Sequence, residues 1–489
     1  MKNRMMCVGS DVSTPFPVTG RVRNPPRQIL THATEETNVR ISSRPFCVFL
    51  LIVGLLAASA PRVTLAQSPA YHFTSIATLN EPAPGGGNFI NDFEPWSINS
   101  SGDIAFVADL STGGEGIFVD RDGQKSQIMR TGQSAPGGGT FAGGSLANSF
   151  INDNGDVAFA FLLGDFPLAG VYHFTRATGA LSAVMVPGVT PVPGGGGTFQ
   201  GASENASLNN GGTIAFAGVI STTKGLPADF GLGVGVFQAN RFGISNVVSP
   251  GDPAPGGHQF DIAFHPWVNA RGDVAFGAHV KGEECIIERT LFCADSVYVK
   301  KASSRQIISI AHQGDPAPVP GGGTYRFAFG PSLNNAGDIA FIGGLSAQSD
   351  NGEDLGVFFY SAAAGRTEAV ALPGDPMPGG GNLLTAPFFR LNYGVSNRSS
   401  VVAFAAVLDT RTNGTDNDSG LYVLSTGGLR LVARTGTVIP GVGTISALTV
   451  TVPGFPIPWS GGAINERGEI PFAATLTDGK TVLLLATPG

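Results

Sequence analysis

The feature that most constrains the fold is an eight-residue motif, Asn-x-x-Gly-x-Ile/Val-Ala-Phe, that recurs along the chain. Five complete copies begin at Asn99, Asn152, Asn209, Asn269 and Asn334, and two degraded copies begin at Asn397 (NRSSVVAF) and Asn465 (NERGEIPF). Successive copies are 53 to 68 residues apart. A period in this range is typical of repeat architectures, in which one small unit is copied several times.

A second motif, rich in proline and glycine, follows the same period. Its copies are EPAPGGGNF from Glu81, QSAPGGGTF from Gln133, VTPVPGGGGTF from Val189, GDPAPGGHQF from Gly251, GDPAPVPGGGTY from Gly314, GDPMPGGGN from Gly374 and GTVIPGVGT from Gly436. Short apolar runs such as GIFV from Gly116 and GLYV from Gly420 lie between the two motifs and are typical of strands. The 70 glycines and 34 prolines suit many short strands and tight turns, and they exclude a mainly helical fold.

Each unit therefore predicts four short antiparallel strands, with Asn-x-x-Gly as the turn between the first two. Asparagine favours the start of such a turn, and glycine accepts its positive φ. The predicted structural turn residues are Asn99, Gly102, Asn152, Gly155, Asn209, Gly212, Asn269, Gly272, Asn334, Gly337, Asn465 and Gly468. Because radial repetition hides strand edges, we predict an all-β, seven-bladed β-propeller of four-stranded antiparallel blades.

The two ends of the repeat region are complementary. Only two strands fit after the motif at Asn465, whereas residues 71–77 (YHFTSIA) form one strand before the first proline-glycine segment. We predict that this N-terminal strand pairs with the C-terminal blade and closes the ring, because open edges would leave backbone groups unsatisfied.

The first 66 residues read as a leader with a signal peptide. An uncharged apolar core at 46–60 follows Arg44, and small residues lead to Ala66. We expect cleavage after Ala66, a single propeller domain over 67–489 and a secreted, extracellular or periplasmic location. The alternatives are a leader that is retained as an anchor and a translation start at Val39.

Charge and cysteine content limit the partners. The chain has 29 Lys and Arg and 36 Asp and Glu, of which 21 and 33 follow residue 66, so the expected mature chain has a net charge of −12. We therefore expect no nucleic-acid partner. We expect a monomer without a membrane span, and an isolated disulfide between Cys285 and Cys293 rather than a zinc site.

The repeat resembles the exported bacterial proteins described as choice-of-anchor tandem repeat NxxGxxAF-containing proteins, over roughly residues 70 to 489. The order of strand, turn and Ile-Ala-Phe is also similar to TolB-like propeller repeats. The first resemblance implies no assigned reaction. Because the chain ends TVLLLATPG without an LPxTG-like motif, the resemblance implies a soluble exported form.

Candidate site residues are few, and most belong to the loops opposite the asparagine turns, which we call the loop-rich face. Loops of variable length on a rigid scaffold are where binding usually resides. Glu94 and Glu204 are candidates for a catalytic pair at the channel mouth, and His265 is a third catalytic candidate. Asp409, Asp416 and Asp418 form an oxygen-rich group that faintly resembles a calcium loop without its full spacing.

No cofactor is expected, because no nucleophile elbow, zinc-protease helix or nucleotide-binding loop occurs in a fitting context. The sequence thus favours a secreted, non-catalytic propeller that binds a protein or glycan through its loop-rich face. The alternative is an extracytoplasmic hydrolase or lyase with its site at the mouth of the central channel.

Overall fold

The computed structural model describes residues 71–143, 148–164, 169–195, 197–221, 232–283, 295–345, 355–386, 393–396, 400–412, 414, 417–448 and 464–489. The chain divides into two compact units, Met1–Val63 and Thr64–Gly489, and every described residue belongs to the second. These residues form β-strands and one short 3-10 helix, η1 (Pro255–Gly257), without an α-helix. Accordingly, no helix in the described ranges has the length and apolar character needed to cross a membrane.

The first five repeat units each supply four consecutive strands. These are β2 (Phe89–Ile98), β3 (Ile104–Leu110), β4 (Glu115–Arg121) and β5 (Gln124–Arg130); β6 (Asn148–Ile151), β7 (Val157–Leu162), β8 (Ala169–Thr175) and β9 (Ala180–Met185); β10 (Gly201–Leu208), β11 (Ile214–Ser221), β12 (Leu232–Asn240) and β13 (Gly243–Val248); β14 (Phe260–Val268), β15 (Val274–Val280), β16 (Ser296–Lys300) and β17 (Ile307–Ala311); and β18 (Tyr325–Leu333), β19 (Ile339–Leu345), β20 (Leu355–Ser361) and β21 (Arg366–Ala371). Consecutive strands within each group pair antiparallel.

The last two units are less regular. The sixth contains β22 (Leu383–Thr385), β23 (Tyr393–Val395), β24 (Val402–Leu408), β25 (Ser419–Ser425) and β26 (Gly428–Arg434), and the seventh contains β27 (Val438–Ile439), β28 (Gly443–Ala447), β29 (Ile470–Leu476) and β30 (Thr481–Pro488). The N-terminal strand β1 (Tyr71–Thr78) pairs antiparallel with β30, from Tyr71 opposite Pro488 to Thr78 opposite Val482. The predicted pairing of the N-terminal strand with the C-terminal strands is confirmed.

The predicted count of seven separate four-stranded blades is wrong. In the described part of the chain, the strands form five separate sheets of four or five strands and one sheet of eight strands. The eight-stranded sheet arises because Ala169, at the start of β8, pairs with Ala202 in β10 and so joins the second and third units. The repeat fixes the order of strands within a unit, but it does not encode a bridge between two units.

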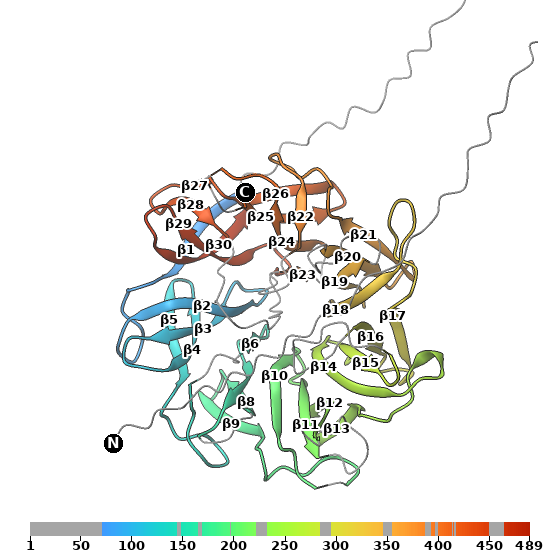
Figure 1. Cartoon of the computed structure of the whole chain (residues 1–489). Helices are drawn as coiled ribbons and strands as arrows, with labels where there is room; N and C mark the ends of the chain where they lie inside the picture. Colours follow the sequence, from blue (N-terminus) through green and yellow to red (C-terminus); the bar gives the residue numbers. More distant parts are fainter. Residues whose placement is uncertain are drawn as a thin grey trace, which may run out of the picture. The chain divides into compact units, whose positions relative to one another are not determined.

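The sheets are arranged around a common centre as a β-propeller. Figure 1 shows β6, β10, β14 and β18 toward that centre and β9, β13, β17 and β21 toward the outside. In the first five units the asparagine turns follow the inner strands β2, β6, β10, β14 and β18, so the repeated motif brings five distant segments of the chain to one end of the central axis.

The phenylalanine that ends the motif builds the core of each regular unit. In the third unit, Phe216 stacks on Phe237 at a centroid distance of 5.9 Å, and Phe199, which ends the proline-glycine segment, meets Phe237 edge-on at 4.8 Å. Equivalent trios are Phe106, Phe118 and Phe89; Phe159, Tyr172 and Phe141; Phe276, Tyr298 and Phe260; and Phe341, Phe358 and Tyr325. Such aromatic pairs each contribute about 0.5–1.5 kcal/mol beyond area burial, which explains why the two motifs recur in phase.

Candidate ligand site on the propeller axis

Each complete asparagine turn is built in the same way. In the third unit, the Asn209 Oδ1 accepts hydrogen bonds from the backbone N–H groups of Gly211 and Thr213, both at 2.9 Å. Gly212 has a φ of 76°, which glycine adopts without the steric cost that a Cβ would bring. The same positive φ occurs at Gly102, Gly155, Gly272, Gly337 and Gly468.

The side chains of these turns link the units into a closed ring of hydrogen bonds. Each donates to the backbone carbonyl of the next: Asn99 to Asn152 (3.1 Å), Asn152 to Asn209 (3.2 Å), Asn209 to Asn269 (2.8 Å), Asn269 to Asn334 (3.1 Å), Asn334 to Ser396 (3.2 Å), Ser396 to Asn465 (3.3 Å) and Asn465 to Asn99 (3.0 Å). We call these seven residues the turn ring. Ser396 stands at the asparagine's place in the sixth unit, and Asn397 lies outside the described residues.

Basic side chains near the turn ring are engaged with acidic residues of the turns. The Asp103 carboxylate accepts from the Asn99 Nδ2 at 3.2 Å and lies 3.4 Å from Arg121 and 3.5 Å from Arg176. In the seventh unit, Arg467 pairs with Glu469 at 2.6 Å. These basic side chains therefore form ion pairs with acidic residues of the asparagine turns.

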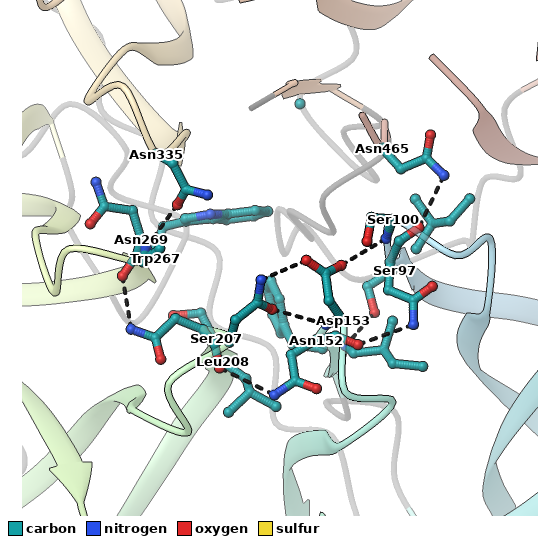
Figure 2. Close-up of a pocket in the computed structure, with 18 of the residues that line it drawn as sticks. Ser97, Ser100, Asn152, Asp153, Ser207, Leu208, Trp267, Asn269, Asn335 and Asn465 are labelled. Carbon is teal, nitrogen blue, oxygen red and sulfur yellow. Dashed lines mark hydrogen bonds between the residues drawn. The ribbon is translucent and has the colours of Figure 1, made fainter. Parts of the chain in front are cut away.

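A pocket with a volume of about 120 Å³ lies inside the turn ring. Its deeper wall includes Ser97, Phe150, Ser207, Trp267, Ser332 and Gly394, each two residues before a turn-ring residue, and its mouth includes Ser100, Asp153, Asn210, Ala270, Asn335 and Glu466, each one residue after. Figure 2 labels residues of both groups, among them Ser97, Ser207 and Trp267 of the deeper wall and Ser100, Asp153 and Asn335 of the mouth. The pocket has room for several water molecules or for one small ring.

Three buried serines line the deeper wall, in the first, third and fifth units. The Oγ atoms of Ser97, Ser207 and Ser332 accept hydrogen bonds from the backbone N–H groups of Ile151 (2.9 Å), Val268 (3.0 Å) and Val395 (3.4 Å) in the following units. A hydroxyl carries one donor hydrogen besides its acceptor lone pairs. Within the described residues, none of these three hydroxyls has an acceptor for that hydrogen.

Aromatic side chains take the same position in the second and fourth units. Phe150 is buried, and Trp267 is half-buried and contacts it edge-on at a centroid distance of 5.1 Å. Figure 2 shows the Trp267 indole extending into the pocket. The pocket wall therefore presents serine hydroxyls and aromatic rings in alternating units.

The two carboxylates of the mouth differ in their surroundings. The Asp153 Oδ1 accepts from the Ser100 backbone N–H at 2.8 Å, and its Oδ2 accepts from the Asn210 Nδ2 at 2.5 Å. The half-buried Glu466 makes no hydrogen bond or ion pair within the described part of the chain. Glu466 is thus the carboxylate available to a ligand.

The predicted catalytic candidates do not come together in this pocket. The backbones of Glu94 and Glu204 lie in β2 and β10, and their side chains are outside the described part of the structure. His265 is buried in β14 at a bulge, with a φ of 52°, and does not line the pocket. Burial lowers the pKa of His265 to about 4, so this side chain is neutral at physiological pH.

A second group of titratable residues lies where β15 leads into the loop-rich face. The His279 Nδ1 and the Asp295 Oδ2 are 3.0 Å apart, and both side chains are buried. Burial lowers the pKa of His279, but the hydrogen bond and charge of Asp295, together with the charges of Asp261 and Glu283, outweigh burial and raise it above its ordinary value.

The remaining predicted residues belong to loops. Asp409 accepts two hydrogen bonds from Asn382, and the buried Asp418 accepts from Thr410 and Thr412 and lies 3.3 Å from Arg434. Burial raises the pKa of Asp418, but these donors outweigh burial and hold the pKa below its ordinary value. Asp418 thus has donors from the protein itself in place of a cation. Asp416, Cys285 and Cys293 lie outside the described residues.

Sequence reasoning missed the pocket because it assigned only a structural role to the asparagine turns. The signal was present at the second residue before each turn. That position holds serine in the first, third and fifth units and an aromatic residue in the second and fourth, whereas a purely structural position would vary less in character.

Comparisons with known proteins identify a family. No curated protein matches the sequence. Solved structures to which the chain is similar include an oligogalacturonate lyase in complex with manganese (12% identity, 86% of this chain and 97% of that chain, TM-score 0.47), TolB from Acinetobacter baumannii (13%, 68% and 64%, 0.36) and a GH74 xyloglucanase from Xanthomonas campestris (13%, 86% and 54%, 0.38). Membership of the NxxGxxAF choice-of-anchor family stays a prediction. The sequence matches a family of unknown function over residues 64–297 and 290–483, and the chain therefore belongs to that family, DUF7453.

Proposed function

We propose that this protein is an exported, non-catalytic binding propeller whose ligand enters the axial pocket. The observation that supports this function is the chemistry of the pocket wall, where buried serine hydroxyls with unused donor hydrogens stand beside a half-buried tryptophan. Ligand sites typically combine aromatic surface with a few placed polar groups in this way. The protein would bind this ligand outside the cytoplasm, because the predicted leader directs export.

The arrangement of carboxylates favours binding over catalysis. Acid–base cleavage of a glycosidic bond by the usual route needs two carboxyl groups in distinct roles. Asp153 is held by hydrogen bonds from Ser100 and Asn210, so of the two carboxylates at the mouth only Glu466 is without a partner among the described residues.

A steric plug tests the proposal. Ala270 is exposed and lines the pocket, and only its backbone N–H is used, in a hydrogen bond to the Asn335 Oδ1 at 2.8 Å. We expect Ala270→Trp to abolish binding on an array of immobilised glycans and cell-surface proteins. The matched control is Ala336→Trp, because Ala336 is also exposed in an asparagine turn but does not line the pocket.

Two other results would require a different function. If Ala270→Trp binds like the wild type while a chain shortened at 411–417 loses binding, the ligand site belongs to the loop-rich face. If the wild type releases soluble fragments from the array and Asp153→Asn does not, the hydrolase or lyase alternative is correct.

A further inference from the structure

We infer that the axial pocket takes an uncharged sugar ring and discriminates against acidic sugars. This inference rests on the proposed function and adds the ligand class to it. It depends on three features of the pocket: its charge, its buried donors and its aromatic wall.

The charge of the pocket is negative. Among the described residues that line it, none is lysine, arginine or histidine, and two are carboxylates, Asp153 and Glu466. Neighbouring cations are engaged elsewhere, since Arg467 pairs with Glu469 and Arg271 lies 3.4 Å from Asp273. A carboxylate on the ligand would therefore meet like charge without a counter-ion, which is unfavourable inside a partly enclosed site.

The buried donors distinguish a sugar from an organic cation. Ser97, Ser207 and Ser332 each have a hydroxyl hydrogen for which the described part of the chain supplies no acceptor, and a sugar oxygen can accept it. An ammonium ligand could use the carboxylates and the indole of Trp267, but its nitrogen has no lone pair to accept a hydrogen bond and would leave these hydroxyl hydrogens unsatisfied.

The carboxylate at the mouth and the aromatic wall also suit a sugar ring. A sugar hydroxyl can donate to the Glu466 carboxylate, which is a stronger acceptor than a neutral oxygen. The apolar C–H face of the ring can pack on the half-buried Trp267, whose position is fixed by its edge-on contact with Phe150. Donors, acceptors and an apolar surface are together the complement of an uncharged sugar ring.

Trp267 provides the readout. The chain has three tryptophans, so a Trp96→Phe/Trp459→Phe background leaves Trp267 as the only tryptophan. We would titrate this protein with the methyl glycosides of glucose, galactose and mannose, with the matching glucuronate, galacturonate and mannuronate, and with tetramethylammonium. We expect a saturable fluorescence change with at least one neutral glycoside and about tenfold weaker binding of its uronate at low salt.

Charge substitutions at Glu466 test whether its carboxylate causes the preference for a neutral sugar over a uronate. Glu466→Gln should weaken the neutral glycoside about fivefold and narrow its advantage over the uronate, because a neutral amide replaces a charged acceptor. Glu466→Lys should reverse the preference. The matched control is Glu368→Gln, since Glu368 is an exposed carboxylate on β21, away from the pocket.

The outcomes distinguish this inference from the proposed function. Uronate binding as tight as that of the neutral glycoside, or tighter binding of tetramethylammonium, would overturn the ligand class alone. If none of these probes changes the Trp267 signal while Ala270→Trp still abolishes binding on the array, the ligand is not a sugar but the pocket is still the site. If no probe changes the Trp267 signal and Ala270→Trp also binds the array like the wild type, the axial pocket is not the ligand site.

Discussion

The side-chain amide of Asn465 donates a hydrogen bond to the backbone carbonyl of Asn99 at 3.0 Å, across 366 residues of sequence. This contact completes the turn ring, and it joins the same kinds of atoms as the asparagine contacts between units that are neighbours in sequence. The two ends of the repeat region are therefore joined twice, by this hydrogen bond at the axis and by the pairing of β1 with β30.

Loss of a turn-ring asparagine should destabilise the protein. We expect Asn465→Ala and Asn209→Ala each to lower the free energy of unfolding by about 2–3 kcal/mol, because buried donors and acceptors lose their partners. Urea denaturation measures this change. The control is the exposed Asn154, whose Nδ2 makes one bond to the Asn210 carbonyl, and Asn154→Ala should have little effect. Equal effects at the three positions would contradict a structural role for the ring.

Two adjacent glycines should respond in opposite ways to alanine. Gly212 has a φ of 76° and open space around it, so Gly212→Ala should cost about 1–2 kcal/mol through backbone strain alone. Gly211 does not have a positive φ; a Cβ there would lie 3.3 Å from the Asn209 Oδ1, and the equivalent position in the fifth unit accommodates the Cβ of Ala336. Gly211→Ala should therefore be neutral or stabilise by up to about 1 kcal/mol. Thermal unfolding of both variants tests the turn geometry, which would be incorrect if the two shifts had the same sign.

His265 should make the protein less stable in acid. Its pKa is about 4 in the folded chain, against 6.5 as the ordinary value. As the pH falls from 6.5 toward 4, the unfolded chain binds a proton at this residue that the folded chain does not, so stability declines by up to about 3 kcal/mol. Asparagine tolerates a φ of 52°, and His265→Asn should flatten the pH profile of urea unfolding. An unchanged profile would show that His265 titrates normally.

His279 should have the opposite effect on the pH dependence of stability. Its pKa is raised in the folded chain, so protonation stabilises the fold below the ordinary pKa, and this contribution is lost as the pH rises through the folded value. Asp295→Asn removes the charge that outweighs burial and should lower the pKa of His279. NMR titration of the imidazole signals measures this shift, with Glu368→Gln as the distant control. A constant pKa would mean that the His279–Asp295 contact is not formed in solution.

We also predict one internal disulfide, between Cys285 and Cys293. Closing so short a loop contributes about 2–3 kcal/mol in the chain-entropy view. Mass spectrometry of the unreduced mature protein should detect a single crosslink, and two free thiols would refute it.

The repeat predicted most of the fold because the determinants lie close together in sequence. The asparagine and glycine of each turn, the four strands of each regular unit and the pairing of residues 71–77 all follow from the motif and its phase. The sheet count did not follow, because the Ala169–Ala202 bridge joins residues with no distinctive pattern. The pocket did not follow either, since Ser97, Trp267 and Glu466 meet only when the units close around the axis.

The pairing of β1 with β30 also fixes when folding can finish. A ribosome makes β1 long before β30, so β1 has no native partner strand until β30 has been synthesised. Units in the middle of the chain can form their own aromatic cores earlier, but the ring cannot. A nonsense mutation before Thr481 removes β30 and so leaves both β1 and β29 without this partner strand.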